Sequence, residues 1–430
     1  MGTPLILPAV GSQMLLGAYA KLKRKPYSMP QAEGYMPSVS VIIPAKNEGR
    51  RIHYALASLE MQTYPIKKVY VIDDCSTDDT VEVVNRVSFL VKKCKIELHK
   101  NKKSIGKTPG VKYATRKATT DKILVLDADT ILYDMRYIEK IVKPHSDPRT
   151  GSSYGTVRPF SRKEQLKTLF KMLIANHYSD SKDLLHFYKN KTKMRPMQAL
   201  SYYFLRWPVE RYREALYLTD QYFVKDIALR LYGTTLYPIG CGVLYDRKLL
   251  AEIFDDYEKT LGDNLTTSED IFIGFSVVNK GYANIQVPDA KMISAEPRVD
   301  QLPRQLFLWT SSFLQSAYYF KNMTFALKPK KDKPVLGWII FFPVVEKITY
   351  PLALAYMFFF DYFYGFVTLL IEYIFYVGIL RLSDPNMPKM RFLKICLVSL
   401  PLRALNLVLD VYVTARFVLD LITGRRNWRK

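Results

Sequence analysis

The sequence is poor in the residues that build disulfide frameworks and zinc sites. It contains 4 cysteines and 5 histidines in 430 residues. No two cysteines have the C-x-x-C spacing of zinc ribbons and redox motifs, and no two histidines lie four residues apart, as in helical zinc sites. We therefore expect neither a disulfide framework nor structural zinc, and a reducing compartment is the natural expectation.

Acidic residues are also scarce, with 40 Asp and Glu against 63 Lys and Arg, which gives a formal net charge of +23. Such an excess favours an anionic partner, which can be a nucleic acid, an anionic membrane face or a phosphorylated substrate. A well-solvated basic surface is the alternative. The sequence has no recognition-helix, zinc-finger or RNA-binding signature, so we expect no nucleic-acid partner.

Long apolar runs are confined to the two ends of the chain. Val335 to Phe360 and Tyr362 to Leu380 are each close to the roughly 20 residues that cross a bilayer. A buried helix pair of a soluble protein is the alternative, but the length and aromatic content favour membrane insertion. In the apolar segment from Phe392 to Ile422, Arg403, Asp410, Arg416 and Asp420 lie on roughly one helical stripe, which leaves a spanning helix and an interfacial amphipathic helix both open.

The N-terminal segment Thr3 to Ala20 is uncharged and precedes a basic cluster from Lys21 to Lys25. A secretory signal has its basic residues before its apolar core, so a short membrane anchor with a cytoplasmic basic flank is expected instead. The chain then divides into a hydrophobic anchor with a basic linker (1–35), a central domain (36–325) and a membrane region with transmembrane and amphipathic helices (326–430).

Strand-like and helix-like segments alternate at the start of the central domain. Short, largely apolar runs at 38–44, 67–74, 95–100 and 122–129 predict strands, and the segments between them have helical spacing. This alternation predicts βαβ units and an α/β fold with a largely parallel sheet. The segment at about 160–232 lacks strand alternation and predicts inserted amphipathic helices. These either lie against a membrane or acceptor, or form a plain helical subdomain.

Acidic pairs follow two of the predicted strands. Asp73 and Asp74 end one strand, and Asp127 and Asp129 follow another. Ligands of such sheets bind beyond the carboxyl ends of the strands, so both pairs are expected in one crevice. Two carboxylates at positions i and i+2 suit a hard cation, Mn²⁺ or Mg²⁺, that bridges phosphates. A solvated loop is the alternative for an isolated D-x-D.

Six motifs in order resemble those of the family-2 glycosyltransferases, which are inverting enzymes with a GT-A fold, and in particular their membrane-integrated branch. They are VSVIIPAKNE (39–48), VYVIDDCSTDDT (69–80), GKTPGVKYA (106–114), LVLDADT (124–130), LTTSEDIFIGFSVVNKGY (265–282) and RQLFLW (304–309). The resemblance implies a mixed, mostly parallel GT-A sheet as the catalytic domain. It also implies metal-dependent sugar transfer from a UDP-sugar, with a β-linked product.

The resemblance assigns donor and metal residues. Asp127 and Asp129 are expected to hold Mn²⁺ or Mg²⁺ against the donor diphosphate, where negative charge builds as the nucleotide leaves. Asp74 is expected to contact uracil, and Lys107 either assists the diphosphate or is an ordinary solvated lysine. The full expected donor site is Pro44, Ala45, Asn47, Glu48, Asp73, Asp74, Lys107, Asp127 and Arg304.

Asp270 is the expected base, which takes the proton from the acceptor hydroxyl. Ser268 is expected to cap the following helix and so to place Asp270 in its first turn. The helix N-terminus stabilises a charged carboxylate, so we expect Asp270 to be ionised at neutral pH. A first-turn acid with a purely structural role is the alternative.

The acceptor site is expected to use two glycines and a short segment of the last motif. Trp309 lies one helical turn after Gln305 and suits stacking on an acceptor sugar, although a core or interface tryptophan is the alternative. The family has arginine before this tryptophan, whereas this chain has Leu308. Arg304, one turn earlier, is expected to compensate. The full expected acceptor site is Gly240, Cys241, Gly242, Glu269, Gln305 and Trp309.

The resemblance leaves the acceptor open. A polysaccharide, as in hyaluronan, chitin or cellulose synthases, is slightly preferred over a lipid, as in ceramide glucosyltransferases, and Leu308 keeps open an inactive relative that scaffolds a synthase. Nucleotide sugars are made in the cytoplasm. We therefore expect an integral membrane protein with membrane-lipid contacts, whose catalytic domain, Lys328–Lys333 and C-terminal GRRNWRK are cytoplasmic.

Overall fold

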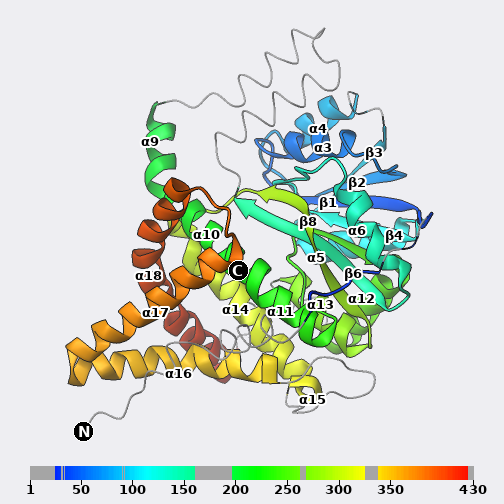
Figure 1. The fold of residues 1–430 in the computed structure, drawn as a ribbon. Coiled ribbons are helices and arrows are strands. Elements are labelled where there is room, and N and C mark those ends of the chain that lie inside the picture. The colour runs from blue at the N-terminus through cyan, green and yellow to red at the C-terminus, as the bar shows by residue number, and fades with distance from the viewer. Residues whose placement is uncertain are drawn as a thin grey trace.

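The computed structural model describes residues 25–159 except 31, 33, 90 and 92, together with 196–261, 268–324 and 338–424. The expected N-terminal anchor, the first part of the inserted segment, Lys328–Lys333 and the basic C-terminus lie outside these residues. A sheet flanked by helices forms one part of the molecule, and three long helices from the end of the chain lie beside it (Figure 1). These are α16 (Trp338–Phe360), α17 (Tyr362–Ser383) and α18 (Lys389–Ile422).

The sheet is mixed and has eight strands in the order β3-β2-β1-β4-β7-β6-β8-β5. Strands β3, β2, β1 and β4 are parallel, β7 is antiparallel to both its neighbours, β6 and β8 are parallel, and β5 is antiparallel to β8. The strands are β1 (Val39–Ala45), β2 (Lys68–Asp73), β3 (Lys95–Lys100), β4 (Lys122–Leu126), β5 (Thr130–Ile131), β6 (Thr150–Pro159), β7 (Gly242–Asp246) and β8 (Ala283–Ser294).

The four strands predicted from the sequence form the parallel half of this sheet. The apolar side chains of β1, β2 and β4 are buried under helices on both faces, whereas β3, at the edge of the sheet, is only partly buried. The connecting helices are α3 (Ile52–Glu60), α4 (Thr80–Ser88) and α5 (Lys107–Lys117). Ser76 and Asp79 have the spacing of a capping box and so predict a helix start at Ser76, but neither side chain caps α4. Helix α4 begins after Asp79, and the Ser76 hydroxyl instead accepts a hydrogen bond from the backbone of Asn47.

The described part of the predicted insertion is helical, as expected, and contains no strand between residues 196 and 232. Helix α10 packs against β6 on one side and against α18 on the other. The remaining elements are α6 (Tyr137–Val142), α9 (Pro196–Leu205), α10 (Trp207–Thr219), a π-helical turn (Asp220–Val224), α11 (Lys225–Tyr232), α12 (Arg247–Leu261), α13 (Glu269–Asn279), α14 (Leu302–Tyr319), α15 (Lys321–Thr324) and 3₁₀ turns at Lys143–Ser146 and Val299–Gln301.

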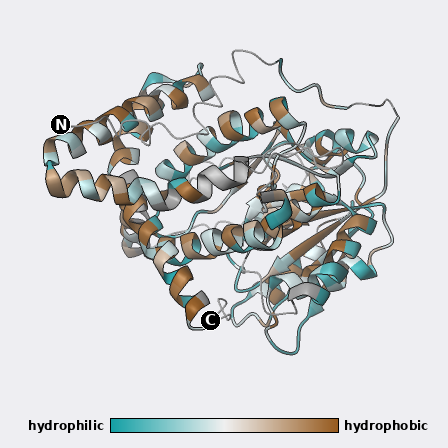
Figure 2. Cartoon of the chain, turned by 90° about the horizontal axis from the view of Figure 1, so that it is seen from below, coloured by the Kyte–Doolittle hydropathy of each residue, from teal (hydrophilic) through white to brown (hydrophobic). Residues whose placement is uncertain are grey.

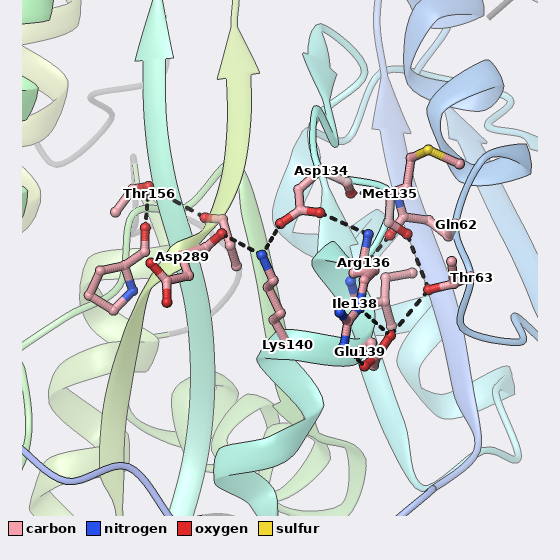
Figure 3. A network of polar contacts seen from close by, with 12 residues as sticks. Gln62, Thr63, Asp134, Met135, Arg136, Ile138, Glu139, Lys140, Thr156 and Asp289 are labelled. Atoms are coloured by element: carbon pink, nitrogen blue, oxygen red, sulfur yellow. Dashed lines mark hydrogen bonds and ion pairs between the residues drawn. The ribbon is translucent and has the colours of Figure 1, made fainter.

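A polar network fixes the chain that follows the D-x-D motif (Figure 3). The backbone carbonyl of Asp134 accepts a hydrogen bond at 3.0 Å from Gln62, which lies just after the end of α3, and its carboxylate pairs with Lys140 at 2.5 Å. Lys140 also donates to the carbonyl of Asp289 in β8 at 3.0 Å. The segment is therefore tied to a helix on one side and to a strand on the other, which limits how far the D-x-D loop can move.

The C-terminal helices are only partly as expected. By length and composition, one described helix, α17, is apolar enough to cross a membrane, and the halves of α18, Lys389–Leu402 and Leu407–Asp420, meet the same criterion as a pair bent by 45°. Helix α16 contains only a shorter apolar stretch, Thr349–Phe360, so a span there stays a prediction. Apolar residues, brown in Figure 2, recur along the helices that lie to the left of the sheet.

Helix α18 does not present its whole charged stripe to water. The Arg416 guanidinium lies over the Phe307 ring of α14, 4.5 Å from its centre. Part of the stripe therefore serves packing against the central domain.

Candidate active site

The loops after β1 and β2 are joined into one wall of the site. Asn47 has a φ of +58° and Cys75 a φ of +59°, a left-handed conformation that side-chain-bearing residues seldom adopt. The Asn47 backbone donates to Ser76 Oγ at 2.9 Å, and its side-chain oxygen accepts from the Thr77 backbone at 2.8 Å. Asparagine suits this position because it tolerates the left-handed region and bonds locally.

Pro44, Ala45 and Glu48 lie in the same wall. Pro44 and Ala45 end β1, where Ala45 is in register with Asp73. Glu48 is paired with Arg51 at 3.2 Å. Burial raises the Glu48 pKa, and Arg51 opposes that shift.

Asp74 organises the loop that leads to α5. Its carboxylate accepts hydrogen bonds from Asn101 Nδ2 (3.0 Å), Ser104 Oγ (2.7 Å) and the backbone of Ile105 and Gly106 (2.7 and 3.0 Å). Burial opposes ionisation of Asp74, but these bonds hold its pKa below the ordinary value. The expected uracil contact of Asp74 stays a prediction, while its visible role is to position the loop.

Asp73, the neighbour of Asp74, is 3% exposed. One of its carboxylate oxygens, Oδ2, accepts from the Ser76 backbone at 3.3 Å. The other, Oδ1, is buried and has no hydrogen-bond partner among the described residues. Within the acidic pair, the carboxylate oxygen without a hydrogen-bond partner in the described part of the chain is therefore that of Asp73.

Lys107 joins the two acidic motifs. It is the first residue of α5, after Gly106 with a φ of +90°. Its ammonium lies 2.7 Å from Asp127 Oδ1 and 2.6 Å from Glu269 Oε1. Burial lowers the Lys107 pKa, but the surrounding carboxylates outweigh this and raise it well above the ordinary value. The solvated-lysine alternative is wrong, because the side chain is engaged with both motifs.

The D-x-D loop crosses the sheet edge beside β7 and β8. The Asp127 backbone donates to the Cys241 carbonyl at 3.1 Å, and the Asp129 carbonyl accepts from Ala295 at 3.3 Å. Burial raises the Asp129 pKa to about 7, and the neighbouring Asp127 and Glu48 carboxylates add to this shift. Crowded carboxylates of this kind favour the binding of a cation.

This donor set fits a hard divalent ion, because carboxylate oxygens are the ligands that Mg²⁺ and Mn²⁺ prefer. No group of three or more His, Cys, Asp or Glu side chains placed to hold a metal ion occurs in the described residues. One or two carboxylates plus substrate phosphates are the usual protein share of a Mg²⁺ site.

Asp270 lies in the first turn of α13, as predicted, and Ser268 is the N-cap residue. The Ser268 side chain makes no capping hydrogen bond to α13. Its backbone donates to Ser312 Oγ at 2.9 Å. The expectation that Asp270 is fully ionised at neutral pH is wrong. Burial and the Glu269 carboxylate raise its pKa to about 7, against the lowering effect of Lys107, and the helix N-terminus does not overcome them.

Gly240 and Gly242 allow the chain to pass close to the site. A Cβ at Gly240 would lie 2.4 Å from Asp270 Oδ2, and one at Gly242 would lie 2.7 Å from Met292 Sδ. Cys241, between them, is buried. A functionless turn is therefore a poor account of this segment, because its backbone forms the surface against which Asp270 rests.

Helix α14 carries the last motif. Gln305 Oε1 accepts from Arg213 Nη2 of α10 at 2.5 Å, and the Arg213 guanidinium lies 4.3 Å from the centre of a Trp309 ring. Arg304 is exposed, and no contact joins it to the acidic residues in the described part of the chain. Its expected role at the diphosphate stays a prediction. Arg213 was missed because nothing in its local sequence separates it from other helix arginines.

Comparison with known proteins identifies the family of the chain. A model of glycosyl transferase family 2 matches residues 40–254. The chain belongs to this family. An N-acetylglucosaminyltransferase of Bradyrhizobium diazoefficiens is 26% identical over 75% of the chain and 60% of its own length. A hyaluronan synthase of Streptococcus pyogenes is 26% identical over 35% of each protein. The chain thus spans less than two thirds of these two relatives.

The fold has a solved counterpart. A mannosyltransferase from Pyrobaculum calidifontis, solved in complex with GDP-Man and Mn²⁺, covers 98% of this chain and is itself covered completely, with a TM-score of 0.56 and 19% identity. The predicted family, the enzyme class and the GT-A fold are therefore confirmed. Donor, acceptor, metal dependence and stereochemistry are matters for proposal.

Gly240→Ala is expected to lower glycosyltransfer by on the order of 10²-fold, because a displacement of about 1 Å at a reacting group costs that much. The new methyl would overlap the Asp270 carboxylate, which lies 2.4 Å away, and push it from its place. The measurement is kcat beside a thermal unfolding scan. Gly378→Ala, where the added Cβ meets nothing within 4 Å, is the matched control. Full activity of Gly240→Ala would show that Asp270 does not need this placement.

Proposed function

We propose that the chain is an inverting, metal-dependent glycosyltransferase that moves a sugar from a UDP-sugar to a polysaccharide acceptor and makes a β-linked product. The observation that carries the proposal is the Lys107 ammonium, which bridges Asp127 of the D-x-D motif and Glu269, the neighbour of Asp270. This bridge supports a donor-phosphate site and a base site that face one another in a single cleft.

On the donor side, the Asn47 loop and the Asp73–Asp74 loop would enclose the nucleoside. The free Asp73 Oδ1 is suited to accept a hydrogen bond from the base, and Asp74 holds the loop that presents Lys107. The Lys107 ammonium is placed to exchange its carboxylate partners for the diphosphate. Asp127 and Asp129 would hold Mn²⁺ or Mg²⁺, which supplies positive charge against the leaving nucleotide when bound.

On the acceptor side, Asp270 would accept the proton of the attacking hydroxyl. The raised pKa makes this carboxylate a stronger base than an ordinary aspartate, and its value of about 7 lies near the pH at which base catalysis is most effective. A single base that acts directly, without a covalent sugar intermediate, implies inversion at the anomeric carbon. Glu269, held by Lys107, would keep this end of α13 in register with the donor.

The acceptor is proposed from the relatives and from α14. Proteins named N-acetylglucosaminyltransferase and hyaluronan synthase favour a saccharide acceptor. Gln305 and Trp309 would offer an amide and an aromatic face to a sugar ring. A lipid acceptor is the second candidate, favoured by the apolar helices that lie beside the catalytic domain. An inactive scaffold is disfavoured by the intact set of acidic motif residues.

We also propose that the C-terminal helices associate with membrane lipids and leave the catalytic domain in the cytoplasm. Helix α17 is long and apolar enough to span. The turn between α16 and α17 exposes a run of aromatic side chains, with Phe359 at 84% and Tyr362 at 71% exposure. Exposed aromatic groups of this kind are typical of membrane interfaces.

The test uses the full chain in native membranes, washed with alkaline carbonate to remove peripheral proteins. UDP-glucose, UDP-GlcNAc and UDP-glucuronate are each supplied with Mn²⁺, and UDP release is measured. The expected result is Mn²⁺-dependent release with one donor, in the washed membranes. When the sugar of that donor is labelled, the label should pass into an ethanol-insoluble, β-linked polymer. Label in the organic phase would favour the lipid acceptor, and an α-linked product or no release from any donor would contradict the proposal.

A further inference from the structure

A buried arginine from the inserted helices lies against the acceptor end of the cleft. Arg213 of α10 is 2% exposed. Its Nη2 donates to Gln305 Oε1 at 2.5 Å, its guanidinium centre lies 4.3 Å from the centre of a Trp309 ring, and its Nε lies 3.7 Å from Glu296 Oε2. One side chain thus contacts the two residues of α14 that the motif singles out, together with a buried acid.

That acid lies next to the metal-binding loop. Glu296 follows Ala295, whose backbone donates to the carbonyl of Asp129. Glu296 is 5% exposed. Burial raises its pKa to about 6, while Arg213 and the Tyr217 hydroxyl lower it. Arg213 therefore contacts both α14 and Glu296, the residue that follows the hydrogen-bond partner of the Asp129 carbonyl.

The chemistry of these contacts is specific to arginine. A guanidinium is planar, donates along its edge and stacks through its face, so it can donate to an amide oxygen and form an ion pair with a carboxylate while it covers an aromatic ring. Lysine keeps the charge but has a point-like head that cannot make all three contacts. A buried charge without its partner is strongly destabilising, so the Glu296 pair also fixes where the guanidinium lies.

Helix α10 also forms an ion pair with the C-terminal helices. Glu214, the next residue, pairs with Arg211 at 2.6 Å and with Arg391 of α18. Helix α10 is therefore anchored between the C-terminal helices and the cleft. The packing of α10 therefore fixes the place from which the Arg213 side chain extends.

We propose that Arg213 is a positioning residue that sets the plane of Trp309 and the amide of Gln305 relative to the D-x-D loop, so that the inserted helices shape the acceptor site. The inference rests on the proposed function for what the acceptor site does. The contact between Arg213 and Trp309 does not depend on the proposed function. Donor binding at Asp73, Lys107 and Asp127 does not involve Arg213.

The experiment compares Arg213→Lys and Arg213→Gln with Arg230→Lys, a control arginine of α11 that pairs with Asp226 on its own helix. Trp309 emission is isolated by subtracting the spectrum of Trp309→Phe. UDP release from UDP-GlcNAc with Mn²⁺ is measured without acceptor and with chitotetraose as the acceptor probe. For Arg213→Lys we expect a shifted Trp309 emission and an acceptor KM raised about 10-fold or more. Acceptor-free UDP release and the Arg230→Lys control should stay near wild type.

Arg213→Lys keeps the charge opposite Glu296, so it decides the matter if Arg213→Gln does not fold. Unchanged Trp309 emission in Arg213→Lys would overturn the proposal. Equal losses of acceptor-free release and of transfer would also overturn it, because a merely structural residue acts on both. Wild-type protein that releases UDP from no donor would overturn the proposed function. The emission of Trp309 would then decide alone whether Arg213 sets its plane.

Discussion

Asp270→Asn is expected to lower turnover by on the order of 10²- to 10⁴-fold, the usual contribution of a general base. Asparagine has nearly the shape of aspartate but cannot take the acceptor proton. Donor affinity should change little, because the ion pairs of Lys107 in the described part of the chain are with Asp127 and Glu269 and not with Asp270. The measurements are kcat from UDP release and donor Kd by calorimetry with Mn²⁺ present.

The same group predicts a pH profile. The base is active when deprotonated, and its pKa is raised to about 7, so wild-type turnover should rise through pH 7 and fall below it. The residual rate of Asp270→Asn should lack this step. Asp255→Asn, which removes an exposed carboxylate paired with Arg116 on the surface, is the control and should keep the wild-type profile.

Stability separates lost chemistry from lost structure. A carboxyl group whose pKa is raised in the folded state binds more protons in the folded than in the unfolded protein. The free energy of unfolding therefore decreases as pH rises from about 4 to about 7. Asp270→Asn removes a buried charge that costs stability at pH 8. Its Tm at pH 8 should therefore be no lower than that of wild type. Turnover above a tenth of wild type in this variant would show that another group is the base.

The parallel half of the fold could be predicted because its signals are local. Short apolar runs that end in Asp or Pro mark the strands β1, β2 and β4, and helical spacing marks the segments between them. The position of acidic residues at strand ends likewise follows from the sequence, since parallel strands share one carboxyl edge. The strands β6, β7 and β8, of which only β7 is antiparallel to the others, pair across long stretches of chain, and no local pattern specifies that order.

The chemistry of the site could be predicted only in part, because burial and distant neighbours decide it. The helix N-terminus predicted an ionised Asp270, but burial and Glu269 outweigh it. Asp74 and Asp73 look equivalent in sequence, yet the carboxylate of Asp74 is occupied by four hydrogen bonds and Asp73 has a free oxygen.

The departure at Leu308 shows the same limit. The sequence points to Arg304, one helical turn away, as the compensating cation. That role of Arg304 stays a prediction, and the structure brings a second arginine, Arg213 of α10, almost a hundred positions earlier in the chain, against Gln305 and Trp309. A helical periodicity can place a residue on a face of its own helix. It carries no information about which other helix supplies a partner.

Asp129→Asn is expected to abolish the effect of Mn²⁺ on donor affinity and to lower turnover by about 10³-fold, since a divalent ion supplies several kcal/mol of charge stabilisation to the leaving group. Asp129 is the D-x-D carboxylate without the Lys107 ion pair, and its raised pKa of about 7 reflects burial beside Asp127 and Glu48. An amide at this position removes one negative charge from the crowded group. The protein without metal should then be at least as stable as wild type.

The decisive measurement is donor Kd across a Mn²⁺ titration for wild type, Asp129→Asn and Asp127→Asn. Asp127→Asn also removes a carboxylate that holds Lys107 when no donor is bound, so it should change donor affinity even without metal, whereas Asp129→Asn should not. This difference separates loss of the cation from loss of the lysine's placement. A donor affinity in Asp129→Asn that still improves with Mn²⁺ as in wild type would show that the ion is held elsewhere.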